Sequence, residues 1–131
     1  MSKNELIARL RITPSFGCGP QHRTLKLVQI NGNFRLDVQD WRKFGSNQKQ
    51  RIPLIAADVQ QQIAMLKQAS ITAFPVSPMV CDGAYIELTI YGESSTLNLG
   101  WWTIAPEGAE AVKAFADWLT AKAKPIDDEE G

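Results

Sequence analysis

The sequence has little of what catalytic and metal sites use most, since its 131 residues include two cysteines and a single histidine. Two cysteines do not make a disulfide scaffold. No apolar run approaches the roughly 18 residues that a transmembrane helix needs, so we expect no membrane segment. The first residues, MSKNELIARLRI, intersperse charges among the apolar positions and so lack the apolar centre of a secretory signal. We therefore expect a soluble cytoplasmic protein.

An excess of charge of one sign is also absent, because 14 Lys and Arg balance 14 Asp and Glu. The balance hides a split: residues 1–55 hold ten basic and three acidic residues, and residues 56–131 hold four basic and eleven acidic ones. Four acids form the run Asp127–Glu130, which is typical of a solvated, disordered tail. We expect a single domain over 1–125 and an acidic tail over 126–131, with a charge asymmetry that attracts a partner of opposite charge.

Apolar alternation predicts the strands. Residues 5–13 alternate as a half-buried strand, and Asn31-Gly32 between two alternating runs predicts a β-hairpin over 23–40. A second hairpin is predicted over 84–103, with a turn at Glu93-Ser94. Because every pairing that can be inferred is an antiparallel hairpin, the pattern predicts an α+β fold with one antiparallel sheet.

Two amphipathic segments predict helices. Pro53 suits the first turn of a helix that fades near Ser70, and Pro106 opens a second helix that Pro125 ends. The polar and basic residues 41–51 indicate a long exposed loop before the first helix. The predicted sheet has about five strands, and the predicted order is βββ-α-ββ-α.

If both helices pack on one face of the sheet, the other face is open and becomes a candidate binding surface. The core face is then expected to carry Leu6, Leu10, Phe34, Leu36, Ile86, Leu88, Leu97, Leu99 and Trp101. The expected partner-binding residues are Arg9, Arg11, Lys26, Arg35, Tyr85, Tyr91 and Trp102 on the open face, with Trp41 and Arg42 in the loop. Protein interfaces enrich aromatic and Arg side chains, and single-stranded nucleic acid stacks on the same types. The plain alternative is a half-exposed sheet solubilised by scattered charges.

Catalytic equipment is sparse. Cys18, His22, Cys81 and Asp82 could form a nucleophilic triad or a zinc site if the strand ends met, but they match no known ligand or triad spacing. Gly17-Cys18-Gly19 lacks the strand before it and the helix after it that a phosphate-binding loop needs. We therefore expect no enzyme activity, no metal and no cofactor.

The C-terminal half resembles a known type of protein. The segment from Cys81-Asp82-Gly83 through AYIELTIYG, LGWW and Pro106-Glu107-Gly108 to Phe115–Leu119 is similar to small bacterial α+β proteins of the toxin-immunity type. The resemblance carries no catalytic motif and no site residue. It implies a non-catalytic domain that binds and occludes a toxin or effector.

We therefore expect an immunity or regulatory protein with a protein partner, such as a co-encoded toxin or effector. An acidic partner would contact the basic residues Arg9, Arg11, Lys26, Arg35 and Arg42, whereas a basic partner would contact the acidic second half. A small nucleic-acid-binding module is the alternative, against which the zero net charge argues. An unpaired edge strand could also join a second copy and form a dimer.

Overall fold

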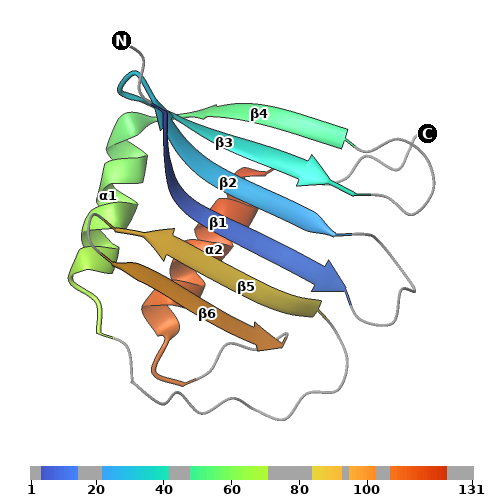
Figure 1. The fold of residues 1–131 in the computed structure, drawn as a ribbon. Helices are drawn as coiled ribbons and strands as arrows, with labels where there is room; N and C mark the ends of the chain where they lie inside the picture. The colour runs from blue at the N-terminus through green and yellow to red at the C-terminus, as the bar shows by residue number, and fades with distance from the viewer. Residues whose placement is uncertain are drawn as a thin grey trace.

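The fold is described from a computed structural model, which defines residues 4–14, 22–41, 48–70, 84–92, 95–102 and 107–123. Within these ranges the chain forms six strands and two helices (Figure 1). In chain order they are β1 (Asn4–Pro14), β2 (Arg23–Ile30), β3 (Asn33–Asp40), β4 (Gln48–Leu54), α1 (Ala56–Lys67), β5 (Ala84–Tyr91), β6 (Thr96–Trp102) and α2 (Glu110–Lys122).

The hairpin of β2 and β3 turns at Asn31-Gly32, as the sequence predicts. Both residues have positive φ, 52° at Asn31 and 85° at Gly32, as the central residues of a type I′ turn require. The twist of that turn matches the right-handed twist of the strands it joins. The predicted hairpin is confirmed.

All strand pairs are antiparallel, and the sheet has the order β4-β3-β2-β1-β5-β6. β1 lies in the interior of the sheet, where it joins the β2–β3–β4 meander to the β5–β6 hairpin. The predicted α+β fold is confirmed. The described part of the chain has four strands before α1 and two after it, instead of three and two.

The additional strand is β4, which the sequence indicates as an exposed loop and a helix start. It pairs with β3, and Pro53 lies opposite Arg35. A proline is tolerated because β4 is an edge strand, where a residue without an N–H can face away from its neighbour. The loop interpretation of residues 48–51 and the helix start at Pro53 are therefore wrong, and α1 begins at Ala56.

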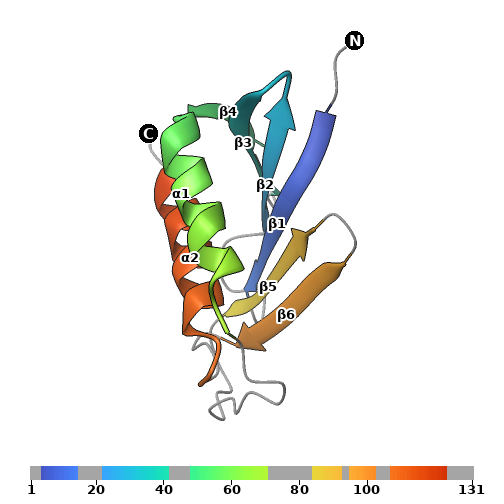
Figure 2. The ribbon, with the colours of Figure 1, turned by 90° about the vertical axis from the view of Figure 1, so that its left-hand side faces the viewer.

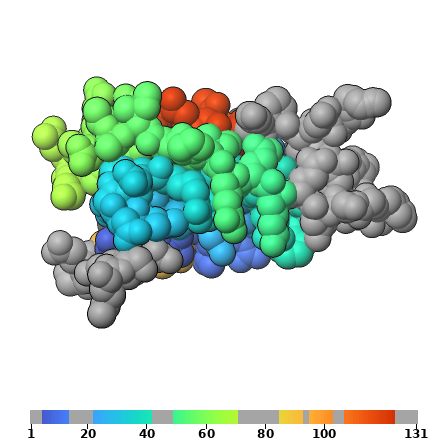
Figure 3. Space-filling model, turned by 90° about the horizontal axis from the view of Figure 1, so that it is seen from above, coloured from blue at the N-terminus to red at the C-terminus, as the bar shows by residue number. Residues whose placement is uncertain are grey.

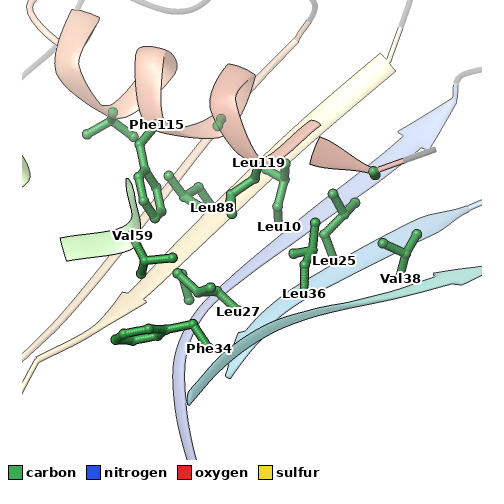
Figure 4. Packing of buried hydrophobic residues seen from close by; sticks show 14 of the residues in the cluster. Leu10, Leu25, Leu27, Phe34, Leu36, Val38, Val59, Leu88, Phe115 and Leu119 are labelled. Carbon is green, nitrogen blue, oxygen red and sulfur yellow. The ribbon is translucent and has the colours of Figure 1, made fainter. Parts of the chain in front are cut away.

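Both helices cover the same face of the sheet (Figure 2). Val59 of α1 and four residues of α2 are buried in one apolar cluster with the core-facing side chains of the strands. Phe115 and Leu119 point from α2 toward Leu10 and Leu88 of the sheet (Figure 4). Viewed onto the β4 edge, α1 and α2 lie on one side of the sheet (Figure 3). The opposite surface of the sheet is therefore left open.

One residue expected in the core lies on the open face. The pairing of β1 with β2 shifts between Leu6 and Ala8, so that Leu6 lies opposite Val28 while Ala8 lies opposite the buried Leu27. A bulge of this kind places one extra residue in a strand and reverses the facing of everything beyond it. The prediction for Leu6 is wrong for this reason, and the adjacent Ile7 packs against the core instead.

Some predictions concern residues beyond the described ranges. The turn at 93–94, the helix-flanking prolines Pro106 and Pro125, and the acidic tail 126–131 all lie outside them. Among the helices that the structure defines, neither has the length and apolar character needed to cross a bilayer.

Candidate functional site

The open face is the surface of the sheet that faces away from α1 and α2, which lie behind the sheet in Figure 1. By strand register, the β1–β4 part of this face gathers basic residues. One row across these strands reads Arg51, Asp37, Lys26, Arg9, and the next reads Lys49, Gln39, Thr24, Arg11. Adjacent strands are only about 4.8 Å apart, so charges in one row stand close together. We call this part the cationic half; its basic residues are Arg9, Arg11, Lys26, Arg35, Lys49 and Arg51.

A hollow of about 570 Å³ opens in the cationic half. Five of the basic residues line it, and its other lining residues include Asp37, Trp41 and the hydroxyl-bearing Thr13 and Thr24. Its volume lies in the range of pockets that hold small ligands or the tip of a bound segment. The five that the cationic half contributes are Arg9, Arg11, Lys26, Lys49 and Arg51, and Arg23, which is paired with Asp40, lines the hollow as a sixth basic residue.

Asp37 is the one acidic side chain that lines this hollow in the described part of the chain, and Arg35 already holds it. Arg35 Nε donates to Asp37 Oδ1 at 2.6 Å, and Arg35 Nη2 donates to Asp37 Oδ2 at 2.9 Å. This bidentate hydrogen bonding from Arg35 to Asp37 raises the pKa of the Arg35 guanidinium. The only carboxylate of the hollow is thereby occupied by a residue outside its lining.

The five basic residues that the cationic half contributes to the hollow have no counter-charge of their own in the described part of the chain. None of them forms an ion pair with any other residue in the ranges that the structure defines. Arg9 Nε is also buried, and no acceptor for it exists among those residues. Buried donors are almost always hydrogen-bonded in native proteins. Apart from Arg35, which is paired with Asp37, the basic residues of the cationic half therefore lack a counter-charge among the described residues, and one of them has an unused donor.

The β5–β6 part of the open face is different in character. Tyr85 and Trp102 pack together with ring centroids 5.2 Å apart and planes at 57°, a favourable tilted arrangement. The Tyr85 ring lies over Gly100, since a Cβ there would be 2.6 Å from Tyr85 Cζ. Trp102 is still 43% exposed, and Tyr91 is half-buried near the start of the turn to β6. We call this part, with Tyr85, Tyr91 and Trp102, the aromatic half.

A polar network marks the boundary between the halves. Asn98 Nδ2 donates to Glu87 Oε2 at 3.0 Å and to Thr89 Oγ1 at 2.7 Å. Glu87 lies opposite Arg11, and Thr89 lies opposite Arg9. No Lys or Arg lies on β5 or β6. The open face is thus divided into a basic part and an aromatic part, rather than mixing the two.

The structure brings most of the predicted site residues together. Arg9, Arg11, Lys26 and Arg35 lie on the cationic half. Trp41 lines the hollow at 43% exposure, with its backbone N–H donating to the carbonyl of His22 at 2.8 Å. Tyr85, Tyr91 and Trp102 form the separate aromatic half, and Arg42 lies outside the described residues.

Lys49 and Arg51 are the site residues that the sequence did not indicate. Both belong to β4, whose pairing with β3 places them in the rows of the hollow. A signal for them exists, because Lys49, Arg51 and Pro53 alternate with Ile52 and Leu54, which pack against the core. A polar edge strand and a polar loop look alike in composition, and this concealed the alternation.

The candidate catalytic residues are only partly visible. Cys18, Cys81 and Asp82 lie outside the described residues. His22 is exposed, with Nδ1 3.3 Å from Thr13 Oγ1. In the ranges defined by the structure, no three His, Cys, Asp or Glu side chains come close enough together to hold a metal ion.

A buried ion pair lies beside the basic rows of the hollow, because Arg23, which also lines the hollow, is paired with Asp40. Arg23 Nε donates to Asp40 Oδ1 at 2.6 Å and its Nη2 to Oδ2 at 3.2 Å, and the Asp40 side chain is fully buried. The pair joins the ends of β2 and β3 in register. Its geometry is that of a structural clamp, because both carboxylate oxygens are already bonded to Arg23.

A comparison with known proteins gives no family for this chain: no protein-family model matches it, and no curated protein does.

Proposed function

We propose that this protein is a non-catalytic binding protein that docks a partner protein on the open face of its sheet, as an immunity or regulatory protein occludes a toxin or effector. The observation that carries the proposal is the division of that face into two halves: a cationic half, in which five of the six basic residues have no ion-pair partner among the described residues, and an exposed aromatic half. The partner that fits it presents an acidic patch beside an apolar one. Long-range attraction by the cationic half speeds encounter, and the aromatic half provides the anchor.

Single-stranded nucleic acid is the second candidate, because basic and aromatic side chains share this face. A nucleic acid strand needs basic groups along its backbone path beside the aromatic residues that stack its bases. Here the basic residues stop at β1, and Glu87 lies between Arg11 and the β6 strand. The full sequence is also neutral, whereas dedicated nucleic-acid-binding domains are usually basic. Segregation of the two residue types favours the protein partner.

The proposal is tested by affinity capture of the tagged protein from its host with nuclease present, followed by mass spectrometry. Two variants remove one half each: Lys26→Ala in the cationic half and Trp102→Ala in the aromatic half. Lys67→Ala is the matched control, since Lys67 is an exposed lysine on α1, away from the open face. Circular dichroism of each variant establishes that it is folded before capture.

We expect the capture of one stoichiometric protein that survives nuclease treatment. Its capture should be lost or weakened with both open-face variants and should be unchanged with Lys67→Ala. Affinities of the purified pair then separate the two roles. Lys26→Ala should mainly slow association and weaken its salt dependence, whereas Trp102→Ala should mainly speed dissociation. Capture of nucleic acid, or capture that is equal for all variants, would contradict the proposal.

A further inference from the structure

The hollow in the cationic half has more positive charge than one carboxylate can satisfy. Besides Arg23, which is paired with Asp40, five basic residues from three strands line it, and its one described carboxylate, Asp37, is bonded through both oxygens to Arg35. A single Asp or Glu side chain of a partner supplies one negative charge and suits one Arg fork. The ligand that matches this hollow therefore has higher charge in a small volume.

We propose that the hollow binds a phosphorylated side chain of the partner protein; this inference rests on the proposed function and names the chemistry of the contact. A phosphorylated side chain has about −1.5 to −2 charge and three strong acceptor oxygens at neutral pH. Arg guanidinium groups bind such oxygens in pairs, and Lys adds point charges. Arg9, Arg11 and Arg51 supply the forks, and Lys26 and Lys49 supply the ammonium groups.

The unused donor of Arg9 is the independent observation. Its Nε is buried, it lies among the residues lining the hollow, and no described residue accepts its hydrogen bond. On one side Arg9 faces Lys26 and on the other Thr89, and Thr89 Oγ1 is already bonded to Asn98. Because Nε is closed to a water-sized atom in this conformation, an oxyanion in the hollow becomes its acceptor when the Arg9 side chain turns toward the hollow.

Neutral donors complete the site. Thr13 and Thr24 line the same hollow as the basic groups, and hydroxyl groups are regular partners of phosphate oxygens. Trp41 lines it as well and is 43% exposed, which leaves its ring free to pack against the chain that flanks a phosphorylated residue. A hollow of about 570 Å³ holds such a side chain together with part of its backbone.

The test uses the whole protein and titrates it by NMR at constant ionic strength. The probes are a Gly/Ala peptide with one phosphoserine, the same peptide with Ser, the same peptide with Glu, and single-stranded oligo(dT). Inorganic phosphate serves as competitor. Lys26→Gln removes one exposed cation of the hollow, Arg9→Gln removes the unused donor, and Lys67→Gln is the matched control on α1.

The phosphopeptide should bind at least about tenfold more tightly than the Ser and Glu peptides, since several charge-assisted hydrogen bonds are gained at once. Lys26→Gln and Arg9→Gln should each weaken it by about tenfold, and Lys67→Gln should leave it unchanged. Lys26 is exposed, so its variant stays informative if Arg9→Gln fails to fold.

Equal binding of the phosphoserine and Glu peptides would overturn the inference, and so would equal losses in Lys26→Gln and Lys67→Gln. Tighter binding of oligo(dT) than of the phosphopeptide, with shifts at the same residues, would overturn it in favour of nucleic acid. If the phosphopeptide does not bind but a captured protein depends on the open-face residues, the phosphate inference fails and the proposed function stands. Phosphopeptide binding without any captured protein would instead contradict the proposed function.

Discussion

Adding one methyl group at Gly100 should report directly on the aromatic half of the open face. A Cβ at this position would lie 2.6 Å from Tyr85 Cζ and 3.3 Å from Tyr85 Cε2, whereas carbon atoms in good contact are about 3.5–4.0 Å apart. The Tyr85 hydroxyl oxygen would be closer still and would overlap the added methyl group, so the Tyr85 ring must shift by more than about 1 Å, and this shift disturbs its packing against Trp102. Overpacking of this kind costs about 1–3 kcal/mol.

Replacing glycine in a strand has an opposite effect that is present in every background. A glycine inside a strand is about 0.5–1 kcal/mol less stable than alanine because of its larger loss of backbone entropy. Gly100→Ala should thus lower the free energy of unfolding of the wild type by up to about 2.5 kcal/mol net. In a Tyr85→Ala background the clash is absent, so the same substitution should raise it by about 0.5–1 kcal/mol.

The assay is urea denaturation of the four proteins of this double-mutant cycle, followed by tryptophan fluorescence. The sign of the Gly100→Ala effect must reverse between the two backgrounds. Effects that agree within about 0.5 kcal/mol would mean that the sites are independent. That result would refute the placement of the Tyr85 ring over Gly100, on which the shape of the aromatic half depends.

Other parts of the molecule give further expectations. Leu119→Ala should lower the free energy of unfolding by about 2–5 kcal/mol in urea titrations, because Leu119 is fully buried between α2 and the sheet. Glu110 accepts the N–H of Gly108 at 3.1 Å, and this hydrogen bond, followed by that of its own amide, lowers the pKa of Glu110. A carboxyl group whose pKa is lowered by folding stabilises the fold at pH values above its ordinary, unfolded-state pKa, and this stabilisation is lost as the pH falls through the folded-state pKa. Glu110→Gln should therefore lower Tm near neutral pH and have no effect in strong acid. Asp37→Asn removes the carboxylate of the hollow and releases Arg35, so titration of the phosphopeptide at two salt concentrations should show tighter binding with a steeper salt dependence.

Local signals in the sequence predicted most of the fold. The errors in the prediction concern features that depend on long-range strand pairing. The Asn31-Gly32 turn is specified by backbone geometry within the turn itself, so it could be predicted with its register. β4 was mistaken for a loop, because Lys49, Arg51 and Pro53 face solvent at a sheet edge and the apolar side of the strand is marked only by Ile52 and Leu54. The facing of Leu6 depends on a bulge, which is a property of the pairing with β2.

The candidate site was predictable in composition and not in arrangement. Alternation along β1 and β2 was enough to place Arg9, Arg11 and Lys26 on one face. The hollow needs Lys49 and Arg51 from β4, and its lack of counter-charge depends on the pair of Arg35 with Asp37. The hollow depends on which strands are neighbours, and the Arg35–Asp37 pair depends on which side-chain rotamers are adopted. The periodic pattern of a sequence contains neither kind of information.

The position of β1 has a consequence for how the binding surface is assembled. The cationic half is built by the meander of β1 to β4, in which each strand pairs with its neighbour in sequence, so it closes through short-range contacts. The aromatic half comes from a hairpin near the other end of the chain and joins only through the β1–β5 ladder. That ladder is the most non-local pairing of the sheet, and its closure carries the largest loop entropy. The complete surface therefore requires the longest-range pairing of the sheet, and a local opening at this one seam would separate its two halves while the meander stays intact.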